Sequence, residues 1–148
     1  MTHDLLYLLH DLARASRMEA DRRASAHGLT LAQWKILMHV ERHPGLSQKE
    51  LSELLEVEPI SVARLIDRLE QHGMVERRDD PTDRRIWRLH LKKGAAPALR
   101  ALARERAEML EALVAGLTPT EIKAVEHATV KMKENVAAGL RVRGLEVA

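Results

Sequence analysis

The chain has 148 residues, of which 45% are hydrophobic and 31% charged, a balance that predicts a soluble globular protein and excludes a disordered one. It contains no cysteine, which excludes disulfide bonds and thiolate metal sites, and it shows neither a signal peptide nor the ~18 consecutive apolar residues of a membrane span, so we expect a cytoplasmic protein. The net charge of only +2 does not by itself indicate nucleic-acid binding, and the scarcity of aromatic residues (no Phe, one Tyr and two Trp) favours helices over sheets in the core.

Two helices are predicted at the start of the chain. Apolar residues recur at helical spacing in the first of them: Leu5, Leu8, Leu9 and Leu12. Gly28 follows this segment as a C-terminal cap would. The second helix begins at Thr30, whose spacing from Gln33 is that of a capping box, and it runs to His43, where Pro44 breaks it.

The next two helices are short and closely joined. Ser47 and Glu50 have the spacing of another capping box, which predicts a helix start. A further helix begins at Pro59, a residue suited to the first helical turn, and it ends before Gly73. Two short helices with so short a connection predict a helix-turn-helix.

A β-hairpin is predicted after these helices, because the apolar period changes from 3.6 to 2. Its strands are Met74–Arg78 and Ile86–Leu91, and the turn-forming residues 79–83 separate them. The segment Val75–Lys93 contains seven cations against four anions, which leaves the rest of the chain at −1. This local excess is what a phosphate-binding surface would show, although a solvated charged hairpin would show it too.

Two further helices complete the chain. The helical period returns after Gly94, and we expect the helix to begin near Pro97, since the lysines before Gly94 cannot cap it as Thr would. Thr118, Pro119 and Glu121 then mark the start of the last helix.

The predicted fold class is therefore mainly α with a small β-hairpin, a winged helix-turn-helix on a helical dimerisation frame. Residues 29–96 form the winged helix-turn-helix, and residues 1–28 and 97–148 form the helical dimerisation region. The apolar stripes of these outer helices exceed what a lobe of some 65 residues could cover, so we expect an obligate dimer.

One face of the helix that begins at Pro59 carries the residue types that read DNA. Ser61, Arg64 and Arg68 follow i, i+3, i+7 and line up opposite the apolar face. A hydroxyl and two guanidinium groups suit the major groove, where Arg can bind guanine through two hydrogen bonds. The alternative is an ordinary exposed face in which Asp67 pairs with one of the arginines.

The predicted hairpin turn carries a second set. Arg84 or Arg85 could enter a minor groove, whose negative potential attracts cations. Asp80 and Asp83 support the wing in this interpretation, because they lie close enough in sequence to hold one guanidinium by a two-bond salt bridge and so to direct its neighbour.

Several motifs together resemble the MarR family of bacterial regulators, most closely its SlyA branch. They are LTLAQW (29–34), LSQKELSELL (46–55), SVARLIDRLEQHGMVERR (61–78) and DPTDRR (80–85). The resemblance implies a homodimer bound to a palindromic operator on double-stranded DNA, with base contacts from the helix bearing Ser61 and minor-groove insertion at the wing. It also implies a small aromatic carboxylate as effector, with Arg14 and Arg17 binding the carboxylate and Trp34 stacking on the ring.

The sequence departs from the family pattern at the end of the wing, where Lys92 and Lys93 occupy part of a segment that is usually Leu-Thr-x-x-Gly. We interpret the two lysines as phosphate contacts. The effector site also has an alternative interpretation, in which Trp34 belongs to the core and the arginines pair with Asp11 or Asp21.

No sequence pattern indicates an enzyme, a cofactor or a metal site. There is no His-Glu-x-x-His, no Gly-rich phosphate loop and no Gly-x-Ser-x-Gly. The alternative function that remains is a winged helix that binds another protein and responds to no ligand. Arginines on both the helix that begins at Pro59 and the predicted hairpin turn favour DNA over that alternative.

Overall fold

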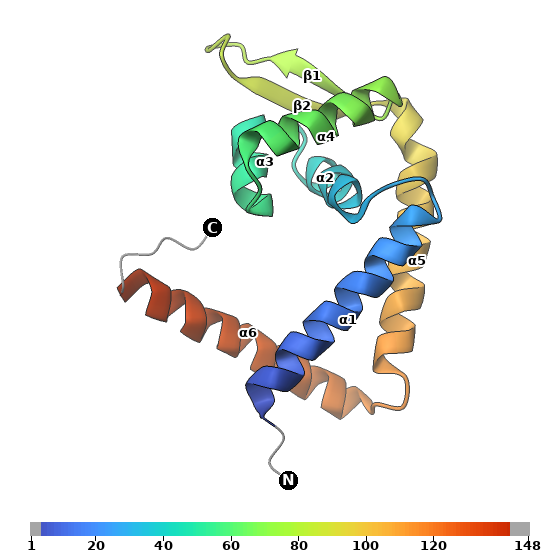
Figure 1. The fold of residues 1–148 in the computed structure, drawn as a ribbon, viewed down its shortest axis with the longest axis vertical. Coiled ribbons are helices and arrows are strands. Elements are labelled where there is room, and N and C mark those ends of the chain that lie inside the picture. Colours follow the sequence, from blue (N-terminus) through green and yellow to red (C-terminus); the bar gives the residue numbers. More distant parts are fainter. Residues whose placement is uncertain (1–3, 143–148) are drawn as a thin grey trace. The chain divides into compact units, whose positions relative to one another are not determined.

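The predicted fold class is confirmed by the computed structural model of the protein, which describes residues 4–142 (Figure 1). Residues 1–3 and 143–148, the outer ends of the predicted helical regions, lie outside the described part. The elements in chain order are α1 (Leu5–Ser25), α2 (Leu31–Arg42), α3 (Gln48–Leu55), α4 (Pro59–Gln71), β1 (Val75–Asp79), β2 (Trp87–Leu91), a 3-10 turn (Lys93–Ala95), α5 (Ala96–Val114) and α6 (Pro119–Val142).

The chain forms two compact units, one ending at Met109 and the other beginning at Leu110, inside α5. The first unit is wider than the predicted lobe of residues 29–96. Ala24 at the end of α1 and Leu102 in α5 are both buried in its core, so α1 and the start of α5 pack with the helix-turn-helix rather than apart from it.

The capping boxes expected from the sequence start the helices as predicted. At α2, the Thr30 hydroxyl accepts the Gln33 N–H at 3.1 Å, and the Gln33 side chain accepts the Thr30 N–H at 2.9 Å. Ser47 and Glu50 make the same reciprocal pair at α3, with distances of 3.1 and 2.8 Å. Each box satisfies N–H groups that the first helical turn leaves without partners, which fixes where the helix begins.

The hairpin is antiparallel, and its register pairs Val75 with Leu91 and Asp79 with Trp87. Its strands differ from the predicted ones by one residue at their ends. The loop before α3 extends the sheet, because the Leu89 N–H donates to the Leu46 carbonyl and the Leu89 carbonyl accepts from the Gly45 N–H, both at 2.9 Å. The wing is therefore attached to the helix-turn-helix by backbone hydrogen bonds as well as by packing.

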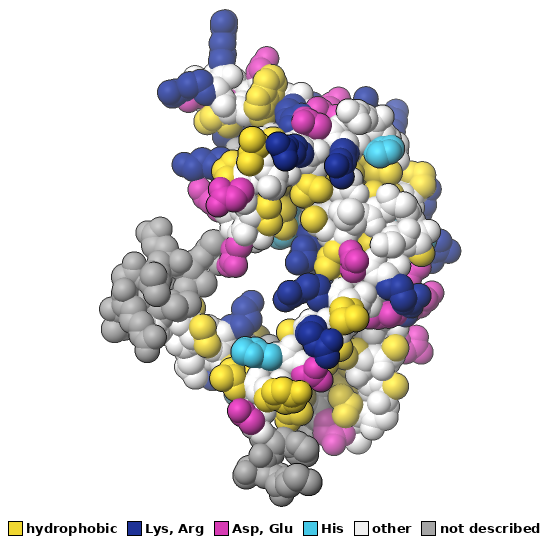
Figure 2. All heavy atoms as spheres, viewed as in Figure 1, with side chains coloured by type: hydrophobic (Ala, Val, Ile, Leu, Met, Phe, Trp, Pro, Cys, Tyr) yellow, Lys and Arg dark blue, Asp and Glu magenta, His cyan; other side chains and the backbone are white. Residues whose placement is uncertain are grey.

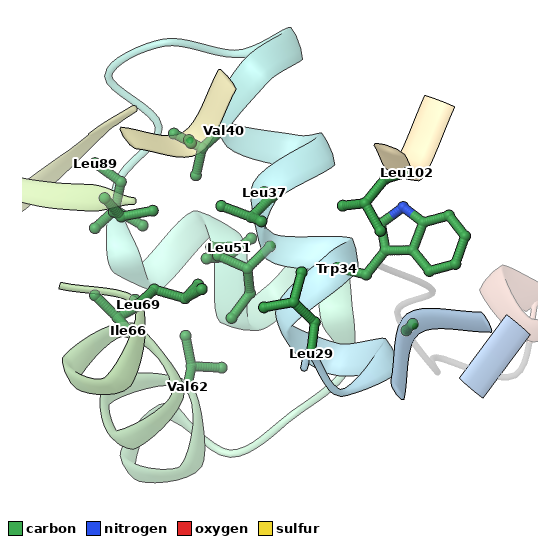
Figure 3. Packing of buried hydrophobic residues seen from close by; sticks show 14 residues of the cluster. Leu29, Trp34, Leu37, Val40, Leu51, Val62, Ile66, Leu69, Leu89 and Leu102 are labelled. Atoms are coloured by element: carbon green, nitrogen blue, oxygen red, sulfur yellow. The ribbon is translucent and has the colours of Figure 1, made fainter. Parts of the chain in front are cut away.

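The core of the first unit is aliphatic apart from Trp34, as the composition predicts (Figure 3). Its fully buried large side chains come from α2, α3, α4, both strands and α5: Ile36, Leu37, Val40, Leu51, Val62, Ile66, Leu69, Val75, Leu89 and Leu102. This core fixes the face that α4 turns to solvent, because Val62, Ile66 and Leu69 all lie on its inner side.

Helix α5 begins at Ala96, one residue from the predicted start near Pro97, after the 3-10 turn. Gly94 lies directly against the end of α4. A Cβ atom at Gly94 would lie 2.5 Å from the Gly73 carbonyl oxygen, so only glycine allows this close approach.

The outer helices expose many apolar side chains. Large residues exposed on α1 are Leu5, Leu6, Tyr7, Leu8, Leu12 and Met18. The second unit exposes Leu110, Leu113, Leu117, Val125, Val130 and Val136. Within residues 4–142, no helix combines the length and the apolar character that a membrane span needs.

Candidate DNA-binding surface

The exposed face of α4 carries the three residues that the sequence singles out. Ser61, Arg64 and Arg68 are all exposed, opposite the buried side of the helix. The alternative pairing with Asp67 is not formed, because the Asp67 carboxylate lies 2.8 Å from Arg77. Within residues 4–142, neither Arg64 nor Arg68 forms an ion pair, so both guanidinium groups are available to an external ligand.

Arg77 on β1 joins the wing to the helix-turn-helix, a role that the sequence analysis missed. Its guanidinium binds the carboxylates of Asp67 and Glu70 on α4 and donates to the Gln48 side chain at 3.0 Å and to the Ala63 carbonyl at 3.1 Å. The half-buried side chain of Arg77 thus connects β1 to both α3 and α4. It holds the recognition helix and the wing in a fixed relation to each other.

At the tip of the hairpin, one arginine is held and the other is not. Asp83 accepts two hydrogen bonds from the Arg85 guanidinium, at 3.0 and 2.9 Å, and a third from the Arg85 backbone N–H at 3.0 Å. These contacts lower the pKa of the Asp83 carboxyl, and the ion pair raises the pKa of the guanidinium. Arg84 is exposed and forms no ion pair within the described part of the chain. The two-bond salt bridge expected at this turn is therefore formed by Asp83, and Arg84 is the free neighbour.

Asp80 supports the turn in a different way from the one expected, since it holds neither Arg84 nor Arg85. Its buried carboxylate accepts from the Thr82 N–H and hydroxyl, from the Asp83 N–H, and from Arg88 Nε at 2.7 Å. Hydrogen bonds from Thr82 and Arg88 hold the pKa of this carboxyl well below its usual range. A carboxylate charged at all ordinary pH values thus closes the turn that presents the tip.

The two lysines lie at the other end of the hairpin. Lys92 follows β2 directly and Lys93 begins the 3-10 turn, and both are exposed. Because the register places Leu91 opposite Val75, the lysines lie at the base of the hairpin, while Arg84 and Arg85 lie at its tip. Lys and Arg side chains protrude from the end of the hairpin in Figure 2.

Trp34 is buried, with 4% of its surface exposed, and lies beside Leu102 of α5 (Figure 3). It also lines a small cavity of about 110 Å³ between α2 and α5. The lining residues are Trp34, Met38, Glu41, Arg42, Leu99, Leu102, Ala103 and Arg106. The indole Nε1 is buried and finds no hydrogen-bond partner among the described residues.

The structure of one chain does not bring Arg14 and Arg17 to Trp34. Arg14 lies over an open hollow on α1 and donates to Asp11 at 2.7 Å, which is the pairing considered as an alternative. Arg17 is exposed on the same helix. The other acid considered as a partner, Asp21, instead accepts the Leu31 N–H at 3.3 Å.

Comparison with known proteins shows which family has this architecture. The family model described as the MarR family matches residues 27–86, which include the helix-turn-helix, β1 and the hairpin turn but not β2. The solved structure of the transcriptional regulator SlyA superposes with a TM-score of 0.80 at 26% identity, covering 95% of this chain and 99% of that one. The chain is thus similar to the MarR family over residues 27–86, and it shares the fold of solved regulators of this family. SlyA is one of several solved MarR-family structures that match about equally well.

Two other proteins described as transcriptional regulators are similar to the chain. A putative transcriptional regulatory protein for the hcr operon of Thauera aromatica is 34% identical over 90 residues, which are 61% of this chain and 52% of that protein, so the match spans about half of the relative's length. A putative MarR-family regulator from Listeria monocytogenes, solved in complex with a 26mer DNA, shares the fold, with a TM-score of 0.80 at 21% identity over 99% of both chains. These relatives are described as regulators, which agrees with the expectation that the chain is not an enzyme.

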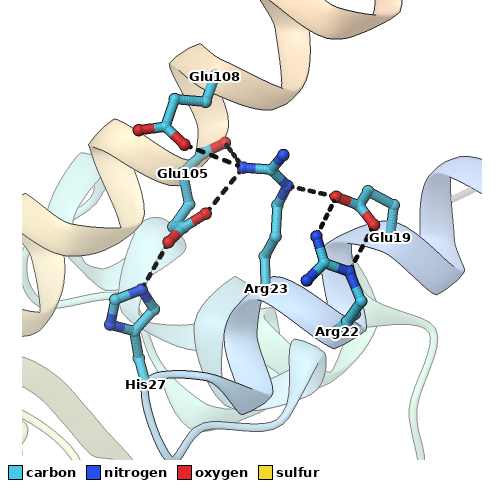
Figure 4. A network of polar contacts seen from close by, with 6 residues as sticks. All are labelled: Glu19, Arg22, Arg23, His27, Glu105 and Glu108. Carbon is cyan, nitrogen blue, oxygen red and sulfur yellow. Dashed lines mark hydrogen bonds and ion pairs between the residues drawn. The ribbon is translucent and has the colours of Figure 1, made fainter.

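A network of charged residues, which no motif in the sequence indicated, joins α1 to α5 (Figure 4). Arg23 binds Glu19 at 2.7 Å and Glu105 at 2.8 Å, and His27 Nε2 lies 2.9 Å from Glu105. Contacts with Arg22 and Arg23 lower the pKa of Glu19 to about 2, and contacts with His27 and Arg23 lower that of Glu105. Partners 78 and 82 residues apart leave no local signal by which the sequence could reveal them.

Proposed function

We propose that this protein is a sequence-specific transcriptional regulator that binds double-stranded DNA as a homodimer on a palindromic operator. The observation that carries the proposal is the unpaired, exposed set on α4, Ser61, Arg64 and Arg68, together with the free Arg84 at the tip of the wing. The match of residues 27–86 to the MarR family model supports it, and so does the Listeria relative that was solved with DNA.

In this proposal α4 enters the major groove. A recognition helix contacts base edges through its N-terminal half, where Ser61 and Arg64 lie. Arg84 enters the adjacent minor groove, and Lys92 and Lys93 contact phosphates from the base of the hairpin. Two such lobes related by a two-fold axis would read half-sites about one helical turn apart.

The homodimer is supported by the apolar surfaces that one chain leaves open. Leu5, Leu6 and Tyr7 on α1 are each at least 60% exposed, and no side chain of α6 that the structure describes is fully buried. Apolar surface of this extent on several helices is typical of protein–protein interfaces. Sedimentation should therefore give a stable dimer at micromolar concentration, and a folded monomer under these conditions would contradict the proposal.

The DNA-binding function is tested by selecting bound sites from random duplex DNA. We expect an enriched palindrome, and Arg64→Ala should then cost roughly 1–3 kcal/mol on it and relax the preference at one position of each half-site. Arg100→Ala, at an exposed arginine of α5 away from α4, is the matched control and should change neither. Failure to enrich any sequence would favour the protein-binding alternative.

We further propose that a small aromatic carboxylate binds at Trp34 and weakens DNA binding. The buried Nε1 without a partner and the cavity beside the ring support a ligand that accepts a hydrogen bond. Two cation pairs could bind the carboxylate: Arg14 and Arg17, the α1 arginines implied by the family resemblance, and Arg42 and Arg106, the cavity arginines that line the space next to Trp34.

The effector is tested by titrating salicylate in a Trp87→Phe background, in which Trp34 is the only tryptophan and reports binding by its fluorescence. A coupling of 1–3 kcal/mol would weaken operator binding roughly 5- to 150-fold at saturation. Replacing both α1 arginines or both cavity arginines with alanine then identifies the pair that binds the carboxylate. Full ligand affinity in both double variants would exclude the site, and unchanged operator affinity at saturation would exclude the regulation.

A further inference from the structure

One large apolar side chain on the proposed recognition helix has no packing partner. Ile60, the second residue of α4, is 64% exposed. Within residues 29–96, all of which the structure describes, only Leu54 and Trp87 are other large hydrophobic residues with exposed side chains, and both are less exposed than Ile60. The dimer proposed above draws on the outer helices and gives no reason for an isoleucine here.

Ile60 lies on the same face as the residues proposed to read DNA. At about 100° per residue, Ile60 and Arg64 are separated by about 40° around the helix, and Ser61 lies within about 60° of Arg64 on the other side. The buried residues of α4, Val62, Ile66 and Leu69, occupy the opposite side. Ile60 therefore extends the exposed Ser61, Arg64 and Arg68 face to the N-terminal end of the helix.

The chemistry of the Ile60 side chain favours contact with a base edge over contact with a phosphate. An isoleucine side chain offers no hydrogen bond to phosphate, and the nearby acidic residues Glu56 and Glu58, both exposed, would repel one. The only apolar group that base pairs present in the major groove is the C5 methyl of thymine. We infer that Ile60 contacts a thymine methyl in each half-site and thereby specifies a T·A pair beside the base read by Arg64.

This inference rests on the proposed DNA-binding function, and the experiment separates the two. Once a site has been selected from random DNA, each thymine is replaced in turn by deoxyuridine, which removes the C5 methyl and leaves every hydrogen-bonding group unchanged. For the wild-type protein, one position per half-site should lose affinity about four-fold, and substitution in both half-sites should lose about 15-fold, as expected for exposing one buried methyl group per site.

Protein variants then assign the effect to the side chain. Ile60→Ala should bind thymine and deoxyuridine sites equally, whereas Ile60→Val, which keeps a branched apolar side chain, should retain most of the preference. Alanine favours helices at least as well as isoleucine, so we expect the fold to be retained. Leu54→Ala is the matched control: it removes an exposed apolar residue from α3 and should keep the full preference of the wild type.

Each outcome is decisive. If the wild type selects a site but no thymine in it is sensitive to loss of its methyl, or if Ile60→Ala keeps the wild-type sensitivity, the inference is wrong while the DNA-binding function stands. If no duplex is selected at all, the proposed function fails and this inference fails with it.

Discussion

The close contact between Gly94 and Gly73 is predicted to be essential for the packing of the start of α5 against the end of α4. Gly94 directly precedes the buried Ala95. It lies against the backbone carbonyl of Gly73, just after the end of α4. Gly94→Ala would place a Cβ 2.5 Å from that oxygen, so the two backbones would have to separate by ~0.5–0.9 Å to reach 3.0–3.4 Å. Both atoms in conflict are fixed to backbone, so rotation of a side chain cannot relieve the overlap.

Overpacking of this kind costs typically about 1–3 kcal/mol in unfolding free energy. We expect Gly94→Ala to unfold at a lower urea concentration than the wild type, at equal protomer concentration, because dimerisation would make stability depend on concentration. The separation would also shift the C-terminal end of α4. Operator affinity should therefore fall by more than the smaller fraction of folded protein alone would explain.

Gly139→Ala is the matched control for this substitution. Gly139 lies within α6, and a Cβ atom added there would meet no described atom of its own chain within 4 Å, so alanine should stabilise the helix by roughly 0.5–1 kcal/mol. Equal unfolding midpoints for wild type and Gly94→Ala would refute the steric reasoning, and a loss of stability in Gly139→Ala would show that the comparison of the two glycines is unsound.

Three further predictions concern the wing. Arg84→Ala should weaken operator binding more than Arg85→Ala, most of all at sites with a narrow, A·T-rich minor groove, because the Arg85 guanidinium is already held in its ion pair; equal losses in titrations would contradict this. Replacing Lys92 and Lys93 with alanine should weaken all sequences alike and flatten the dependence of log K on log salt by up to ~0.9 per lost phosphate contact, whereas a loss confined to the operator would assign the lysines to base reading. Since the folded-state pKa of Asp80 lies below its ordinary value of 3.8, its contribution to hairpin stability is present above that value and is lost as the pH falls through the folded-state pKa. NMR signals of Thr82 and Asp83, whose N–H groups donate to this carboxylate, should therefore report loss of these hydrogen bonds only in acid below pH 3.8, and Asp80→Asn should weaken the hairpin already at neutral pH.

Local signals in the sequence were sufficient to place the elements. A capping box is formed by side chains three residues apart, so Thr30 with Gln33 and Ser47 with Glu50 predict helix starts without knowledge of the rest of the fold. The change of apolar period after Gly73 is likewise local, and it located the hairpin to within one residue at the strand ends.

The contacts that orient the elements could not be predicted in this way. Arg77 reaches Gln48, 29 residues away, and Arg23 reaches Glu105, 82 residues away. Any acidic residue could have been the partner in the sequence, since the choice depends on which surfaces the core brings together. The same reason explains why Asp80 was assigned to the wrong guanidinium: the pleat of β2 places Arg88 beside it, although Arg84 and Arg85 are nearer in sequence.

The ion pairs also change what the charge of the hairpin means. Four of the seven cations between Val75 and Lys93 are engaged with carboxylates of the chain itself: Arg77, Arg78, Arg85 and Arg88. Their positive charge is largely neutralised within the fold, where it fixes the wing and the recognition helix. Within the described residues, the cations of this segment without an ion pair are Arg84, Lys92 and Lys93. Most of the basic excess of this segment is thus structural. The three unpaired cations, with Arg64 and Arg68 of α4, are those that we propose to contact DNA.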